Sequence, residues 1–98
     1  MPAYVISEVD VRDVDAMEAY RSLAARAITK YGGRYLVRGG VAETIEGGPP
    51  AKTLIIVEFP SMACLREWYG SADYAEALKL RETALDRRLI FVEGLAQA

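Results

Sequence analysis

The sequence predicts an α+β fold over residues 1–98, with one four-stranded antiparallel sheet that carries helices on a single face. Segments rich in β-branched and aromatic residues alternate with segments whose apolar residues recur at the helical period, in the order β-α-β-β-α(α)-β. The chain is 52% hydrophobic, and no linker, low-complexity tract or internal repeat divides it. These observations predict one globular domain.

The first half of the chain predicts a strand followed by a long helix. Residues 3–9 are rich in β-branched and aromatic types, which favour strands. Asp13 and Asp15 are candidate N-caps for a helix whose apolar residues recur at the helical period over residues 17–31. Gly32-Gly33 follows at once and is expected to end this helix, because glycine adopts the left-handed C-cap conformation without strain.

The middle of the chain predicts a hairpin. Residues 34–46 are expected to be extended, with a bulge at Gly39-Gly40. The Gly47-Gly48-Pro49-Pro50 run predicts the loop. Residues 52–59 are apolar at nearly every position, which is typical of a strand covered on both faces.

The remaining elements are a broken helix and a final strand. Ser61 is a candidate N-cap, and Gly70-Ser71 is expected to interrupt the helix. Asp73 and Glu76 have the spacing of a capping box and predict the next helix start. Residues 88–95 predict the last strand.

This element order is the split βαβ, or ferredoxin-like, arrangement, whose sheet has helices on one face only. The second face should then show polar residues in alternation, yet residues 55–57 and 89–92 are apolar without interruption. The chain has no spare element to cover that face. We therefore expect a homodimer in which two sheets pack face to face.

Charge and composition exclude several functional classes. Twelve basic and fourteen acidic residues give a net charge of −2, which disfavours nucleic-acid binding. The sequence has no basic amphipathic helix and no long apolar run, so membrane association is also disfavoured. The chain has no histidine and one cysteine, Cys64, so no metal site and no cofactor are expected. The first residues lack the pattern of a signal peptide, which makes the cytoplasm the expected location.

Arg38 and Glu58 are the candidate catalytic residues. Arg38 adjoins the paired glycines in a strand that should be covered, where its guanidinium can hold a carboxylate or an enolate. Glu58 interrupts the most apolar strand, and a bulge at Gly39-Gly40 is expected to bring it near Arg38. The two residues are then either an anion site with an acid–base partner or a structural ion pair.

Six aromatic residues with polar atoms suggest a pocket between the helices and the sheet. The alternative interpretation is that they pack in the core and their hydroxyls bond to the backbone. Tyr35 is the best candidate for substrate binding because it shares a strand with Arg38, and Trp68 is the next. Arg34 is expected at the surface, and Cys64 is expected to be inert.

The chain contains the strings Tyr31-Gly32-Gly33-Arg34-Tyr35-Leu36-Val37-Arg38-Gly39-Gly40, Glu58-Phe59-Pro60, Trp68-Tyr69-Gly70-Ser71 with Tyr74, and Glu93-Gly94. Together they resemble a bacterial domain-of-unknown-function family, "thirteen-thirty". The resemblance implies the dimeric α/β-barrel superfamily, which includes cofactor-free monooxygenases, muconolactone isomerase-like enzymes and haem-dependent proteins. A haem role that needs a histidine ligand is excluded, since the chain has none.

Two functional hypotheses follow. In the first, each protomer holds a pocket for a small acidic or carbonyl compound, which can be aromatic, with oxygenase- or isomerase-like chemistry that needs no cofactor. In the second, the protein is a non-catalytic binding or stress-associated interaction module, in which Arg38 and Glu58 form a structural pair. The sequence leaves open whether the protein is an enzyme.

Overall fold

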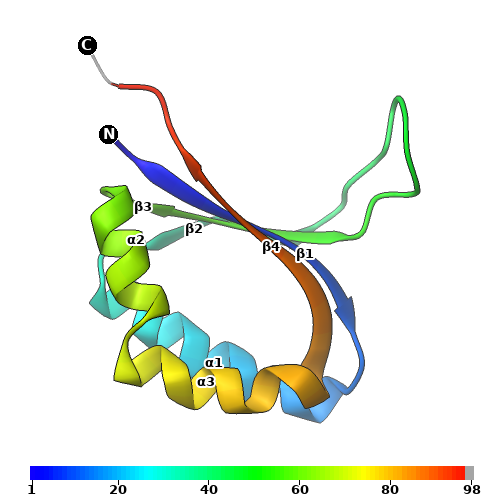
Figure 1. Cartoon of the computed structure of the whole chain (residues 1–98). Coiled ribbons are helices and arrows are strands. Elements are labelled where there is room, and N and C mark those ends of the chain that lie inside the picture. The colour runs from blue at the N-terminus through cyan, green and yellow to red at the C-terminus, as the bar shows by residue number, and fades with distance from the viewer. Residues whose placement is uncertain (97–98) are drawn as a thin grey trace.

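The computed structural model describes residues 1–96. Its elements are β1 (Ala3–Val11), α1 (Val14–Lys30), β2 (Arg34–Gly40), β3 (Thr53–Phe59), α2 (Met62–Tyr69), α3 (Ala72–Ala84) and β4 (Leu85–Glu93). The four strands form one antiparallel sheet in the order β2-β3-β1-β4, and the three helices lie on one face of it (Figure 1). The predicted α+β, ferredoxin-like fold is confirmed.

Each helix begins at a side-chain cap. The carboxylate of Asp13 accepts a hydrogen bond from the backbone N–H of Ala16 at the start of α1. Ser61 caps α2 in the same way, as predicted. The cap of α3 is Ser71, whose hydroxyl accepts from the N–H of Tyr74, so the predicted capping box at Asp73 is wrong. Because Ser71 lies directly after the break and already caps a free N–H group, α3 begins two residues earlier than a cap at Asp73 would place it.

Several strand boundaries differ from the prediction, two of them by three residues or more. β2 ends at Gly40, and residues 41–52 form a projecting loop instead of an extension of the strand. Gly47 and Gly48 adopt left-handed backbone angles there, and two prolines follow that cannot donate to a ladder. β4 begins at Leu85, three residues earlier than predicted, because the ladder with β1 extends to Val11.

The main core lies between the helices and the sheet. Val5, Val57 and Phe59 point from the strands toward Leu65 and Tyr74 of the helices, and all five are buried. Where α1 gives way to β2, the chain passes so close to Phe59 that a Cβ at Gly33 would lie 2.8 Å from its ring. This position therefore requires glycine because there is no space for a side chain.

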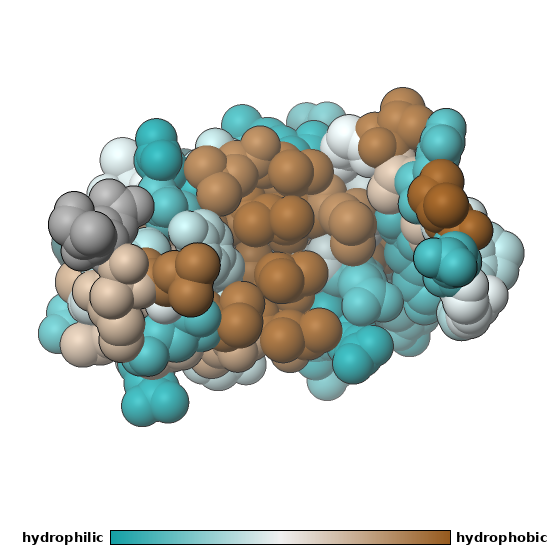
Figure 2. Space-filling model, turned by 90° about the horizontal axis from the view of Figure 1, so that it is seen from above, coloured by the Kyte–Doolittle hydropathy of each residue, from teal (hydrophilic) through white to brown (hydrophobic). Residues whose placement is uncertain are grey.

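The other face of the sheet carries an apolar row that crosses all four strands. Val37, Ile56, Ile6 and Ile90 are successive partners in the ladders, so their side chains share this face. Figure 2 looks onto it and shows apolar residues gathered at its centre. We call it the open face. The prediction that β3 and β4 are apolar on both sides is confirmed.

Charged pairs border the apolar row. Arg34 and Glu58 form an ion pair at 2.7 Å on one side, and Arg88 lies 3.5 Å from Glu8 on the other. No helix among residues 1–96 is long and apolar enough to cross a membrane.

Candidate functional site

The register of β2 decides which of its side chains reach the helices. Arg34 pairs with Glu58, Tyr35 with Val57, and Arg38 with Ile55, and the ladder shifts at Leu36 and again at Gly39. Each shift inserts one extra residue, which is the signature of a β-bulge. The bulge at Gly39 was predicted, and its φ of +75° suits glycine. The bulge at Leu36 was not predicted.

The expected proximity of Arg38 and Glu58 is wrong. Because of the bulge at Leu36, Arg38 points to the helix face, while Glu58 lies on the open face and pairs with Arg34. Arg38 is also exposed and not buried, and its guanidinium lies 4.2 Å from the centre of the Tyr35 ring. A cation–π contact of this kind holds the guanidinium in place without neutralising it.

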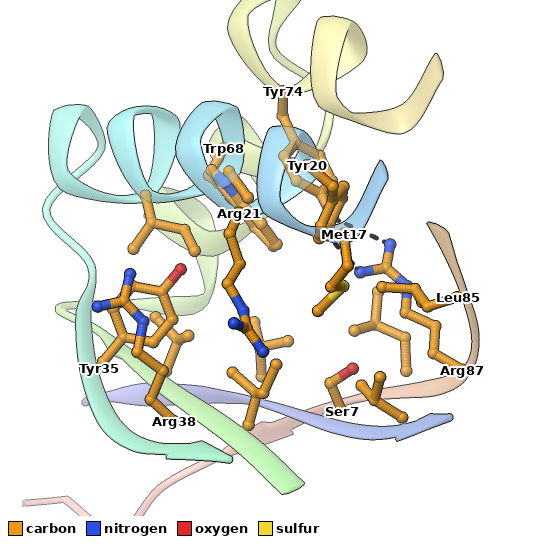
Figure 3. Close-up of a pocket in the computed structure, with 17 residues that line it drawn as sticks. Ser7, Met17, Tyr20, Arg21, Tyr35, Arg38, Trp68, Tyr74, Leu85 and Arg87 are labelled. Carbon is orange, nitrogen blue, oxygen red and sulfur yellow. Dashed lines mark hydrogen bonds between the residues drawn. The ribbon is translucent and has the colours of Figure 1, made fainter. Parts of the chain in front are cut away.

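A pocket opens between α1 and the helix face of the sheet, and Arg38 stands at its edge (Figure 3). About 510 Å³ in and above it is free of protein atoms, in part open to solvent, but only about 40 Å³ admits the centre of a water-sized sphere. The smaller volume corresponds to roughly three water molecules. The pocket is therefore a narrow slot that suits a small, slender or flat ligand.

Three arginines line this slot: Arg21 of α1, Arg38 of β2 and Arg87 of β4. No carboxylate is among the described residues of its wall, and none of the three arginines forms a salt bridge within residues 1–96. The remaining wall is apolar apart from hydroxyl groups and the indole of Trp68. The pocket is therefore strongly cationic in a protein whose net charge is negative.

Arg87 forms a cluster with two buried tyrosines. Its guanidinium donates to the hydroxyl of Tyr20 at 2.6 Å and to that of Tyr74 at 2.9 Å, and the two hydroxyl oxygens are 2.5 Å apart. Burial raises the pKa of the Tyr74 hydroxyl, so this phenol keeps its proton at neutral pH. Burial opposes the charge on Arg87, but the two tyrosine oxygens outweigh it and raise the guanidinium pKa.

Trp68 closes the inner wall of the pocket. The side chain is only 2% exposed and lies 4.3 Å, centre to centre, from the ring of Tyr74. Its Nε1–H is buried without a hydrogen-bond partner in the described part of the chain. Such a group costs free energy when it is left unpaired, and it is the type of donor that a ligand oxygen satisfies.

The structure brings three of the predicted site residues together. Tyr35, Arg38 and Trp68 all line the slot, whereas Glu58 does not, and their part in binding stays a prediction. Burial raises the pKa of Tyr35, with Arg38 acting in the opposite direction. Cys64 is a half-buried free thiol outside the pocket. Residues 1–96 contain no group of three side chains placed to hold a metal ion.

Sequence reasoning missed Arg21 and Arg87. Arg87 was placed before the last strand, which was expected to begin at residue 88, so no face could be assigned to it. Because β4 begins at Leu85, side-chain alternation puts Arg87 on the helix face with Leu85 and Leu89. Arg21 lies one residue after Tyr20 on α1, and only its long side chain reaches back to the slot (Figure 3).

Comparisons with known proteins support the fold and the family. RPA0582, a protein of unknown function from Rhodopseudomonas palustris, is 26% identical, with a TM-score of 0.76 over 98% of this chain and 84% of its own. SnoaB, a cofactor-independent oxygenase from Streptomyces nogalater, is 7% identical, with a TM-score of 0.64 over 98% of this chain and 95% of its own. At that identity the similarity establishes the fold alone.

A dimeric protein of unknown function with a ferredoxin-like fold, from Bacteroides fragilis, is also similar. It is 15% identical, with a TM-score of 0.55 over 95% of this chain and 96% of its own. No curated protein matches the sequence. Residues 2–95 match the family described as Domain of unknown function (DUF1330), and the chain belongs to that family.

Proposed function

We propose that the slot binds a small organic anion. The observation that carries this proposal is the presence of three arginines, with no carboxylate, in a wall that is otherwise largely apolar. Arg87 is half-buried without a counter-ion among residues 1–96, which is costly, while Arg21 and Arg38 are exposed and also unpaired there. A carboxylate or enolate that accepts two parallel hydrogen bonds from such a guanidinium is therefore favoured. The chain supplies the cations, and the ligand supplies the negative charge.

The rest of the wall defines the shape of the ligand. Tyr35 and Trp68 present aromatic rings, while Val57 and Leu89 present aliphatic groups from the sheet. The narrow volume excludes a bulky cofactor-sized molecule. An aromatic or conjugated acid, phenolate or enolate fits both the charge and the walls.

We also propose that the protein is a homodimer built on the open face. A second copy would cover the apolar row of Val37, Ile56, Ile6 and Ile90, and the similar protein from Bacteroides fragilis is dimeric. The loop of residues 41–52 extends to the same side of the sheet, and its Val41 is 98% exposed. In such a dimer the pockets remain on the outer side of each sheet, one in each copy.

Turnover without a cofactor is the second candidate function, since SnoaB has the same fold and is a cofactor-independent oxygenase. A hydroxyl of the Tyr20–Tyr74 pair would donate a hydrogen bond to the bound ligand, but the raised pKa of Tyr74 makes that phenol a weak acid. Glu58 is on the opposite face, and the described wall holds no carboxylate or histidine to remove a proton. Binding is therefore favoured over acid–base catalysis.

Trp68 makes binding directly measurable, because it is the only tryptophan and lies in the pocket wall. The purified protein would be titrated with small carboxylates, phenols, quinones and lactones, and indole fluorescence followed. We expect a saturable change for an anionic class, weakened roughly tenfold in Arg38→Met, which keeps the aliphatic stem but removes the charge. Thermal unfolding in the same solutions should show a matching stabilisation.

Arg66→Met is the matched control, since Arg66 is an exposed arginine of α2 that does not line the pocket. It should bind like the wild type. The proposal is overturned if no anion in the panel changes the fluorescence or the unfolding temperature, or if Arg38→Met and Arg66→Met bind equally well.

A further inference from the structure

The cations of the slot are not gathered at one point. Arg38 belongs to β2 and Arg87 to β4, which are the two edge strands of the sheet. Three strand spacings separate these edges, or about 14 Å between backbones. Figure 3 shows Arg38 with Tyr35 on one side of the slot and Arg87 with Tyr20 and Tyr74 on the other. The slot therefore has a cation at each end, and the side chain of Arg21 reaches down from α1 between them.

The cluster at the inner end has a hydroxyl proton to spare. Tyr20 and Tyr74 each accept a hydrogen bond from Arg87, and only one of their two hydroxyl protons can lie between their oxygens. The other proton has no acceptor in the part of the chain that the structure describes. Tyr20 is 6% exposed and Tyr74 is fully buried, so bulk water does not satisfy this proton.

Arg87 also has N–H groups without acceptors, and a charge without a counter-ion, among residues 1–96. Two of its five N–H groups are used in the bonds to the tyrosines, and no carboxylate pairs with it among residues 1–96. The next residue behaves differently, since Arg88 points to the open face and lies 3.5 Å from Glu8. Of these two neighbouring arginines, the one without a counter-ion among residues 1–96 is the one that faces the slot.

We propose that the cluster of Arg87, Tyr20 and Tyr74 is a second oxyanion-binding end of the slot, and that the ligand carries an oxygen-rich group at each end. The class that fits is a slender dicarboxylate or oxo acid with an aliphatic or aromatic middle. One end accepts from Arg87 and the spare tyrosine hydroxyl, and the other meets Arg38, with Arg21 between the two ends. This inference rests on the proposed function, because it specifies the ligand of the same pocket.

Pairs of acids that differ only in the second charged end test this inference on the unmodified protein. Adipate would be compared with hexanoate, and terephthalate with benzoate, by calorimetry and by Trp68 fluorescence. We expect each diacid to bind at least roughly tenfold more tightly than its monoacid, since the second end adds charge-assisted hydrogen bonds. A series of unbranched diacids of increasing length should show one optimum, set by the distance between the two ends.

Variants then assign the preference to the cluster. Arg87→Met should reduce the affinity for the diacid to that for the monoacid, and Tyr20→Phe, which removes one hydroxyl at nearly constant volume, should remove part of the preference. Arg66→Met should leave it unchanged. Circular dichroism and thermal unfolding would establish that each variant is folded.

The outcomes separate the two proposals. Equal binding of diacids and monoacids by the wild type overturns the two-ended ligand but leaves an anion pocket in place. A preference for diacids that persists in folded Arg87→Met or Tyr20→Phe, with its full size, also overturns the assignment to the cluster. If neither class binds, the proposed function fails as well.

Discussion

Both faces of the sheet are apolar, yet they differ in whether the charged residues beside them are paired. On the open face, the ionic groups around the apolar row are paired, as Arg34 is with Glu58 and Arg88 is with Glu8. On the helix face, Arg38 and Arg87 have no carboxylate partner within residues 1–96. Paired charges around an apolar surface suit contact with another protein surface, because nothing is left to neutralise. Unpaired cations in a slot suit a negatively charged ligand.

The largest expected effect comes from placing a charge at the centre of the open face. Ile56→Asp should weaken dimerisation by about 3 kcal/mol or more, which is roughly a hundredfold or greater, because an unpaired carboxylate would be buried between the sheets. The protomer itself should tolerate the change, since Ile56 is only half-buried in it. Sedimentation velocity over a range of protein concentrations would measure the dissociation constant.

The matched control introduces the same charge on the helix side. Val14 is 72% exposed at the start of α1, where an aspartate interacts favourably with the helix dipole. Val14→Asp should leave the association unchanged. Dimerisation by Ile56→Asp with wild-type affinity would show that the open face is not the interface.

A smaller effect on stability is expected from alanine substitutions at two glycines, Gly33 and Gly40. Gly33→Ala should destabilise the fold by about 1–3 kcal/mol, because its Cβ would be forced against Phe59 and Ile28. Gly40→Ala is the comparison, since a Cβ there would be 3.8 Å from Val37, an ordinary contact. Urea unfolding should show a clear loss for the first and a change within about 1 kcal/mol for the second. Equal losses would contradict the tight packing at Gly33.

The smallest expected effect is a pH dependence that belongs to the helix face. Burial raises the pKa of Tyr74 in the folded protein above its unfolded value of about 10. The resulting stability is fully present below about pH 10 and is lost as the pH rises toward the folded pKa, by at most about 1.4 kcal/mol per pH unit. Tyr74→Phe should therefore lose stability less steeply than the wild type between about pH 9 and about pH 11. Denaturant unfolding at each pH would measure both slopes, and identical slopes would contradict the assignment.

The fold was predictable because its signals are local. The apolar period of α1, the caps at Asp13 and Ser61, and the apolar run of β3 each depend on a few neighbouring residues. The face of the sheet to which Arg38 points was not predictable, because it depends on a bulge at Leu36, where the sequence has neither glycine nor proline. The cluster around Arg87 joins α1, α3 and β4, and it required a strand boundary known to within one residue.

The bulge at Leu36 has a consequence for how such a chain can diverge. β2 is an edge strand that pairs only with β3, so one residue can be inserted or deleted there without disturbing β1 or β4. Removing Leu36 while Tyr35 keeps its partner would leave Val37 opposite Ile56 and Arg38 opposite Ile55, so Arg38 would still face the slot. Keeping Leu36 in a regular strand without the bulge would instead turn Arg38 toward the open face, because side-chain direction alternates along a strand. The bulge thus decides whether the residue at position 38 faces the slot or the open face. Alignments of relatives should be checked for this bulge before an arginine near this position is equated with Arg38.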